Sequence, residues 1–131
     1  MAKVLSHIGR DLYRIEIKTP TGNVIVADEP LDNGGQDKGF SPKELLAASL
    51  AACTSATIRM YADRKGWDVA EINTETELER DGETNKTLIS RKIQLVGNLD
   101  EAQKARLLIV ANSCPVHKIL SSQIVIETQL K

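Results

Sequence analysis

Residues 41–67, SPKELLAASLAACTSATIRMYADRKGW, predict one long helix that is central to the fold. Ser41 suits the N-cap, the proline after it suits the first helical position, and Glu44 completes a capping box with Ser41. We expect the helix to continue to about Lys65, where the glycine that follows ends it.

Cys53 lies near the middle of this helix, among small residues at positions 47, 48, 49, 51 and 52. Such residues let another backbone approach closely, so we expect the helix to be enclosed. An apolar stripe at spacings of three and four predicts a buried face formed by Leu46, Leu50, Cys53, Thr57 and Met60. A buried cysteine is either inert packing or, where a cation stabilises its thiolate, a reactive group. The position alone leaves both interpretations open.

The remaining segments predict an α+β fold. Alternating residues and turn signals indicate strands, whereas acidic residues followed by apolar ones indicate a second helix. The expected elements are strands at 3–8, 13–19 and 24–28, a loop at 29–40, strands at 67–80 and 86–99, helices at 100–113 and 115–122, and a last strand at 123–129. Sheets with helices laid on one face fit this order, in a single domain over residues 1–131.

Composition excludes several classes of function. The net charge of −1 and an aromatic content of 3% argue against nucleic-acid binding, which requires surplus Lys and Arg and stacking rings. No run of apolar residues is long enough to span a membrane, and the first eleven residues lack the apolar core of a signal peptide. We therefore expect a cytoplasmic protein with no membrane partner, in which both cysteines are reduced.

Cys114 directly precedes a proline that begins the short helix. The sulfur is therefore expected at an N-cap, where free amides and the helix dipole favour an anion, although an ordinary capping role explains it equally well. His117 either donates a hydrogen bond near Cys114 or faces solvent. Cys114, His117, Cys53 and His7 are the types of side chain that bind zinc, but His7 and Cys53 do not form the close pair typical of such sites, so we expect no metal and no cofactor.

Two cysteine motifs in this order, SPKELLAASLAACT (41–54) and CPVHKIL (114–120), resemble those of the OsmC/Ohr family of small bacterial thiol proteins. The preceding stretch DEPLDNGGQDKGFSP (28–42) also looks like that of OsmC-like members. The resemblance implies an OsmC-like α+β fold with antiparallel sheets, a long central helix that carries the cysteine, and a second helix. It further implies an intertwined homodimer in which the two cysteine-bearing helices pack centrally.

The resemblance also implies reduction of organic hydroperoxides and hydrogen peroxide. Cys53 would attack the peroxide, its sulfenic acid would condense with Cys114 to a disulfide, and a dithiol reductant would restore both thiols. The family places an arginine of the N-terminal sheet beside the reactive cysteine; Arg14 is the best match, Arg10 is the alternative, and a solvated strand residue is another interpretation of Arg14.

Glu44 is the candidate for the acidic residue that holds this arginine in the family. In peroxidase members that residue directly follows the proline, whereas here Lys43 occupies the position and Glu44 follows it. One residue turns a helical side chain by about 100°, so the capping box alone also explains Glu44.

A second function is compatible with the same sequence. The chain would be a non-catalytic binding or redox-sensing module that uses a buried dimer pocket for an apolar or thiol-bearing ligand. The peroxidase requires the α-carbons of Cys53 and Cys114 to lie within about 7 Å of each other and a guanidinium to reach Cys53, whereas the binding module requires neither.

Overall fold

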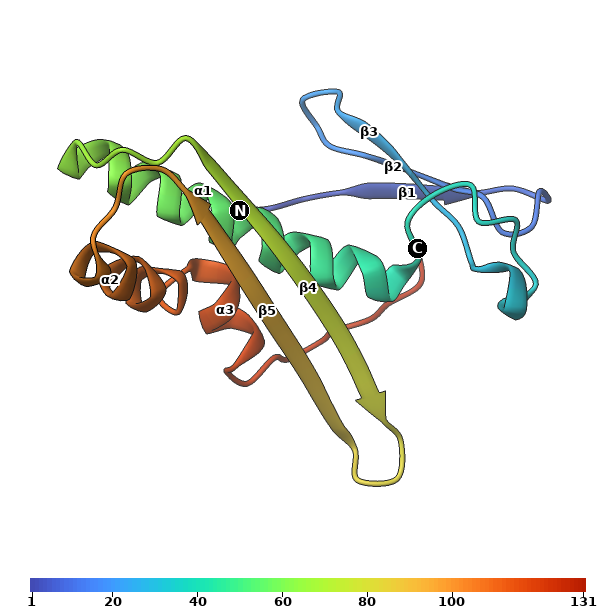
Figure 1. Ribbon diagram of the computed structural model, residues 1–131. Helices are drawn as coiled ribbons and strands as arrows, with labels where there is room; N and C mark the ends of the chain where they lie inside the picture. The colour runs from blue at the N-terminus through green and yellow to red at the C-terminus, as the bar shows by residue number, and fades with distance from the viewer. The chain divides into compact units, whose positions relative to one another are not determined.

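The chain divides into two compact units, Met1–Leu46 and Ala47–Lys131, in a computed structural model that describes all residues from 1 to 131. The first unit contains a three-stranded sheet in the order β1-β2-β3, and the second contains the two-stranded sheet β4-β5 (Figure 1). All strand pairs are antiparallel. The predicted α+β class with antiparallel sheets is therefore confirmed, while the single domain over 1–131 stays a prediction.

Three short strands form the first sheet: β1 (Leu5–Ile8), β2 (Ile15–Lys18) and β3 (Val24–Ala27). A tight turn joins the last two, in which the backbone N–H of Gly22 donates to the carbonyl of Thr19 at 3.0 Å. Gly22 has a φ of 97°, which favours glycine. The three predicted strands are thus confirmed with shorter bounds.

The glycine-rich loop after β3 is organised around the carboxylate of Asp28, which is only 2% exposed. Its oxygens accept backbone N–H groups from Tyr13 at 3.2 Å, Glu29 at 2.8 Å and Lys38 at 3.1 Å. Burial by itself raises the pKa of this carboxyl, but the backbone donors together hold the pKa below its ordinary value. Gly35 is required in this loop because any Cβ there would collide with the carbonyl of Glu29. The loop includes a short 3₁₀ turn, η1 (Leu31–Asn33).

Helix α1 (Pro42–Lys65) has the predicted bounds. The capping box is present: the backbone N–H of Ser41 donates to Glu44 Oε1 at 2.9 Å, and the N–H of Glu44 donates to Ser41 Oγ at 3.2 Å. The backbone N–H of Ser41 lowers the pKa of the Glu44 carboxyl below its ordinary value. Gly66, at a φ of 69°, ends the helix as predicted.

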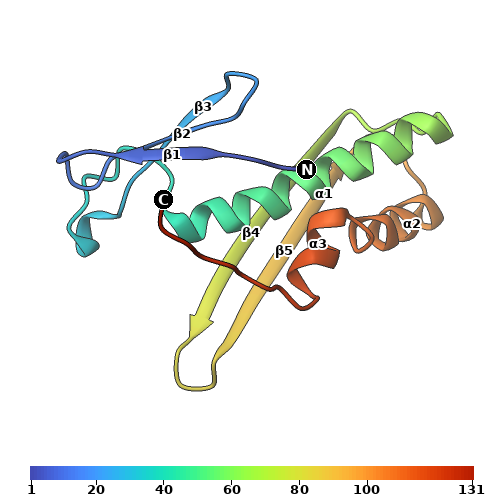
Figure 2. The same cartoon turned by 180° about the vertical axis from the view of Figure 1, so that it is seen from behind.

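The second unit is a long hairpin with helices on one of its faces. Views from opposite sides show α1, α2 and α3 on the same side of the hairpin (Figures 1 and 2). Its elements are β4 (Glu71–Asp81), β5 (Lys86–Val96), α2 (Glu101–Ala111) and α3 (Pro115–Leu120). Asp100 caps α2 through a capping box with Gln103. The core of this unit is a cluster of Ile58, Ala62, Val69, Leu107 and Ala111.

The predicted buried face of α1 was largely wrong. The buried residues of the helix are Leu50, Thr54, Ile58 and Ala62. Of the predicted stripe only Leu50 is buried; Cys53 and Thr57 are half-buried, whereas Leu46 and Met60 are exposed. Alanine, serine and threonine occur on nearly every side of this helix, so the sequence pattern does not distinguish one apolar face from its neighbour.

The last predicted strand, 123–129, was also wrong. Residues 123–131 have no regular structure and are exposed. Ile124 and Ile126 alternate with other residues as they would in a strand, but a strand forms only where another strand accepts its hydrogen bonds, and no strand of this chain pairs with the segment.

By length and composition α1 could cross a membrane, whereas the sequence analysis expected no segment able to do so. The core helix of a water-soluble protein passes the same test. Ile58 and Ala62 of α1 lie in the core cluster with Leu107 of α2, and α1 carries charged side chains at Arg59 and Asp63. These contacts explain α1 as a core helix of the second unit.

Candidate functional site

Both cysteines are free thiols, and both belong to the second unit. Cys53 is half-buried on α1, whereas Cys114 is completely buried. Cys114 occupies the N-cap of α3, as predicted, and its Sγ accepts the backbone N–H of His117 at 3.4 Å. This hydrogen bond holds the sulfur of Cys114 at the start of α3.

Arg91 of β5 is the residue that the sequence interpretation missed. Its Nη1 donates to Thr54 Oγ1 at 3.0 Å and to the backbone carbonyl of Ala111 at 3.1 Å. Its Nη2 donates to Asn112 Oδ1 at 2.9 Å and lies 2.7 Å from His117 Nδ1. One half-buried guanidinium therefore joins α1, the end of α2 and α3.

These contacts connect the surroundings of both cysteines. Thr54 is the residue after Cys53 on α1, and Asn112 and His117 stand on either side of Cys114. The same guanidinium thus fixes the turn of α1 that carries Cys53 against the segment that carries Cys114.

His117 neither donates from its ring to Cys114 nor faces solvent freely. The side chain is half-buried, and the donation to the sulfur comes from its backbone N–H. Because the guanidinium of Arg91 can only donate, His117 Nδ1 acts as the acceptor and the ring proton belongs on Nε2.

The sequence does contain a signal for Arg91. Ile89, Ile93 and Leu95 alternate along β5 as the half-buried face of the strand, and Arg91 is the charged residue in that series. A charged side chain on the inward face of a strand is uncommon and requires partners. Its partner across the hairpin is Thr76, whose Oγ1 is buried without a hydrogen-bond partner.

Two of the pockets in the second unit are lined by side chains of both α1 and β5. One, of about 280 Å³, has polar groups from Arg91 and His117 beside apolar side chains; its lining is Leu50, Thr87, Ile89, Arg91, His117, Leu120 and Ser121. The other, of about 330 Å³, is mostly apolar and is lined by Ile58, Ile93, Leu95, Lys104, Leu107 and Leu108. Leu50 stands one helical turn before Cys53, but neither cysteine lines the first pocket.

The other predicted site residues lie in the first unit. Arg14 is exposed directly before β2, and its backbone N–H donates to the carbonyl of Asp11 at 3.0 Å. Glu44 is engaged in the cap of α1. The assignment of Arg14, or its alternative Arg10, and of Glu44 to the surroundings of Cys53 stays a prediction.

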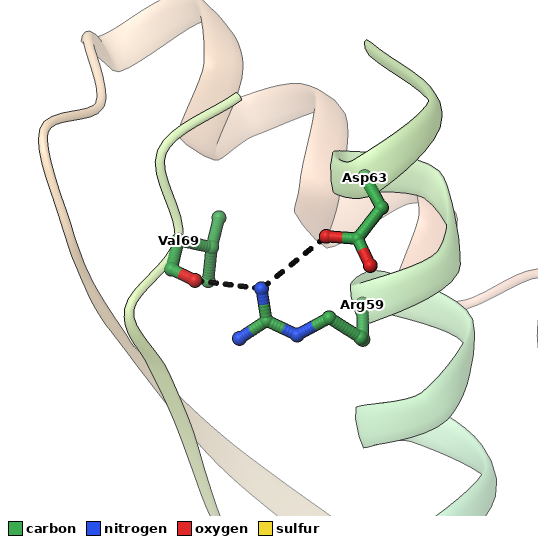
Figure 3. Close-up of polar contacts among 3 residues, drawn as sticks. All are labelled: Arg59, Asp63 and Val69. Atoms are coloured by element: carbon green, nitrogen blue, oxygen red, sulfur yellow. Dashed lines mark hydrogen bonds and ion pairs between the residues drawn. The ribbon is translucent and has the colours of Figure 1, made fainter. Parts of the chain in front are cut away.

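Arg59, six residues after Cys53 on α1, is engaged with other groups. Its Nη1 donates to the carbonyl of Val69 at 2.6 Å and forms an ion pair with Asp63 at 3.5 Å (Figure 3). These contacts fix the chain after α1 rather than serve a thiol. No group of three or more His, Cys, Asp or Glu side chains is arranged to hold a metal ion.

The family model described as OsmC-like protein matches residues 35–129. Among solved structures, a protein of Psychrobacter arcticus 273-4, provisionally named an osmotic stress induced and detoxification response protein, is 28% identical with a TM-score of 0.80, over 91% of this chain and 88% of its own. An OsmC like protein of Mycoplasma pneumoniae has a TM-score of 0.77 at 20% identity, over 92% and 86% of the two chains. A comparison with curated protein sequences finds no match.

The organic hydroperoxide resistance protein OhrB of Bacillus subtilis has a TM-score of 0.63 at 24% identity, over 92% of this chain and 90% of its own. At such identity, the likeness to the Mycoplasma and Bacillus proteins demonstrates the fold alone. The resemblance to the OsmC/Ohr family that the two cysteine motifs suggested is confirmed.

Proposed function

The chain belongs to the OsmC-like protein family, and from this premise we propose that it is a thiol-dependent peroxidase that reduces organic hydroperoxides and hydrogen peroxide. The observation that carries the proposal is the Arg91 network, which joins the residue after Cys53 to residues on both sides of Cys114. Two free thiols whose surroundings are joined in this way suit a reactive and resolving pair.

In the proposed reaction, the Cys53 thiolate attacks the terminal peroxide oxygen, the O–O bond breaks, and the alkoxide leaves as an alcohol after taking a proton. Cys53 is then a sulfenic acid. Cys114 attacks that sulfur, a disulfide forms, and the hydroxide leaves as water. A dithiol reductant then reduces the disulfide and is itself oxidised to a disulfide.

The pocket beside Arg91 and His117 supports organic peroxides as substrates. Leu50, Ile89 and Leu120 provide apolar surface for an alkyl group, and polar groups lie on the same lining. Two solved relatives, from Legionella pneumophila and Bacillus subtilis, carry the name organic hydroperoxide resistance protein. Arg14 is carried into the proposal as the cation that would stabilise the Cys53 thiolate, and Glu44 as the carboxylate that would hold Arg14 in place.

A homodimer in the cytoplasm completes the proposal. Met60 on α1 is 65% exposed, and Ile124, Val125 and Ile126 are exposed together near the C-terminus. Exposed apolar side chains of this kind commonly mark a contact between proteins, and a second copy of the chain would cover them. The cytoplasm keeps thiols reduced, as a regenerated Cys53–Cys114 pair requires.

Peroxide consumption by the purified protein with a dithiol reductant tests the function, with cumene hydroperoxide and hydrogen peroxide compared. We expect Cys53→Ser to abolish turnover and Cys114→Ser to leave a Cys53 sulfenic acid that excess peroxide oxidises further. Ala52→Ser is the matched control, since it places a hydroxyl at the neighbouring exposed position of α1 and should retain turnover.

The alternative is a non-catalytic binding or redox-sensing module. The pocket of about 330 Å³ favours it, since Ile58, Leu107 and Leu108 would suit an apolar ligand. Consumption by the wild-type protein no faster than that by Cys53→Ser would contradict the peroxidase and leave this alternative.

A further inference from the structure

The guanidinium of Arg91 has no acidic partner. The ion pairs of the chain are Lys18–Glu16, Arg59–Asp63 and Lys104–Glu101, and all four acceptors around Arg91 are neutral. A charge that is half-buried without a counter-ion is costly unless hydrogen bonds satisfy it. Arg91 therefore functions through its hydrogen bonds rather than through an ion pair.

Those hydrogen bonds leave Arg91 little capacity for a ligand. A guanidinium has five N–H donors, and the contacts to Thr54, Ala111, Asn112 and His117 engage the four on Nη1 and Nη2. The remaining Nε–H cannot grip a carboxylate or phosphate with two parallel bonds. Arg91 consequently holds groups of the protein itself in place.

The groups that it holds surround Cys114. Asn112 and His117 stand two residues before and three residues after the cysteine, and the backbone N–H of His117 also donates to its sulfur. On α1, Thr54 Oγ1 donates a hydrogen bond to the backbone carbonyl of Leu50 and accepts one from the guanidinium of Arg91. The guanidinium of Arg91 thus fixes the segment around Cys114 relative to the part of α1 that contains Cys53.

We propose that Arg91 is a positioning residue for disulfide formation between Cys53 and Cys114, an inference that rests on the proposed peroxidase. In that step the Cys114 thiolate attacks the sulfenic sulfur of Cys53, the S–S bond forms, the S–O bond breaks, and hydroxide leaves as water after taking a proton. The rate depends on how much of the time Cys114 lies in a position to attack. Arg91 raises that fraction through its hydrogen bonds to Thr54, Asn112 and His117.

Arg91→Met tests the proposal, because methionine retains similar length and removes every donor. The first measurement is the effective concentration of Cys114 toward Cys53, taken from the equilibrium of the protein with reduced and oxidised glutathione and without peroxide. We expect it to fall by about tenfold, as the loss of oriented contacts at a reacting pair does. Arg91→Lys, which keeps the charge but loses the fork, should give an intermediate value.

The second measurement separates positioning from a general loss of structure. In a single turnover with cumene hydroperoxide, the rates of Cys53 sulfenic acid formation and of disulfide formation are followed separately in Arg91→Met, because Arg91 also lines the pocket proposed for the peroxide. The disulfide of the variant should form about tenfold more slowly, so more Cys53 should reach sulfinic acid in excess peroxide. Mass spectrometry of the quenched reaction counts each form.

Two further variants keep the test decisive. Asn112→Ala removes one acceptor at an exposed position and should lower the effective concentration by a smaller factor, even if Arg91→Met does not fold. Arg80→Met is the matched control on the same hairpin, since Arg80 is exposed and bonds only Thr87 and Asn85. It should stay within about twofold of the wild-type value.

The outcomes distinguish this inference from the proposed function. An unchanged effective concentration in Asn112→Ala and in folded Arg91→Met would overturn the positioning role, as would a wild-type protein that forms no Cys53–Cys114 disulfide. If the effective concentration falls in the variants but the wild-type protein consumes no peroxide, the positioning role stands and the peroxidase fails.

Discussion

Replacement of Ile58 by alanine tests which face of α1 is buried within the chain. Ile58 is 0% exposed and belongs to the core cluster with Leu107 and Ala111. The substitution removes three buried carbon atoms, worth about 2.4 kcal/mol at about 0.8 kcal/mol each, and adds the cost of the cavity. The higher helix propensity of alanine offsets a few tenths of a kcal/mol. We expect a net loss of about 3 kcal/mol in the free energy of unfolding.

Met60→Ala is the matched comparison, two residues further along the same helix. Met60 is 65% exposed, although its spacing from Cys53 and Thr57 predicts burial. Its replacement should cost less than about 0.5 kcal/mol in dilute protein. Urea unfolding followed by far-UV circular dichroism measures both variants. An unchanged slope of the free energy of unfolding against urea concentration indicates that the same two states are compared.

The reasoning is refuted if the two variants lose similar free energy at every protein concentration, or if Ile58→Ala loses under about 1 kcal/mol. A cost of Met60→Ala that appears only as the protein is concentrated has a different meaning. It would identify Met60 as part of a contact between copies, because association stabilises the folded state by mass action.

Three other substitutions have defined outcomes. Asp28→Asn should lower the melting temperature at neutral pH. Because the pKa of Asp28 is lowered in the folded state, its contribution to stability is fully present above the ordinary value of 3.8 and is lost as the pH falls toward the folded pKa. The difference in melting temperature from the wild type should therefore close over that range of pH. Gly66→Ala should cost about 1 kcal/mol in urea unfolding, because φ is 69° there and no atom lies near enough to obstruct the methyl group; no loss would contradict the left-handed geometry. Thr76→Val should raise the free energy of unfolding by about 1 kcal/mol, since it removes a buried hydroxyl without a hydrogen-bond partner, and destabilisation would indicate a partner such as bound water.

The local elements of the fold were predictable because their signals are local. The cap at Ser41 and Glu44, the end of α1 at Gly66 and the N-cap at Cys114 depend on residues within one turn of each other. The buried face of α1 was not predictable, since its small residues suit burial on several sides and the partners lie far along the chain. The last strand failed because 123–129 lacks a partner that its own sequence cannot supply.

The candidate site divides in the same way. The motifs indicate Cys53 and Cys114 as candidates, and their assignment stays a prediction. Arg91, by contrast, connects residues 20 to 37 positions away, so no local pattern indicates its partners. Its place on the inward face of β5 was a usable clue. Glu44 illustrates the opposite case, in which a local explanation, the cap, accounts for the residue whether or not it has a second role.

The two-stranded hairpin has a consequence for amide hydrogen exchange. Since β4 has only β5 as a neighbour, every second backbone N–H of β4 points to the outer edge, away from the ladder. Those outward amides should exchange with solvent deuterium nearly as fast as in an unstructured peptide, while the inward ones exchange slowly. Slow exchange of the outward set would mean that a strand from another molecule lies along that edge.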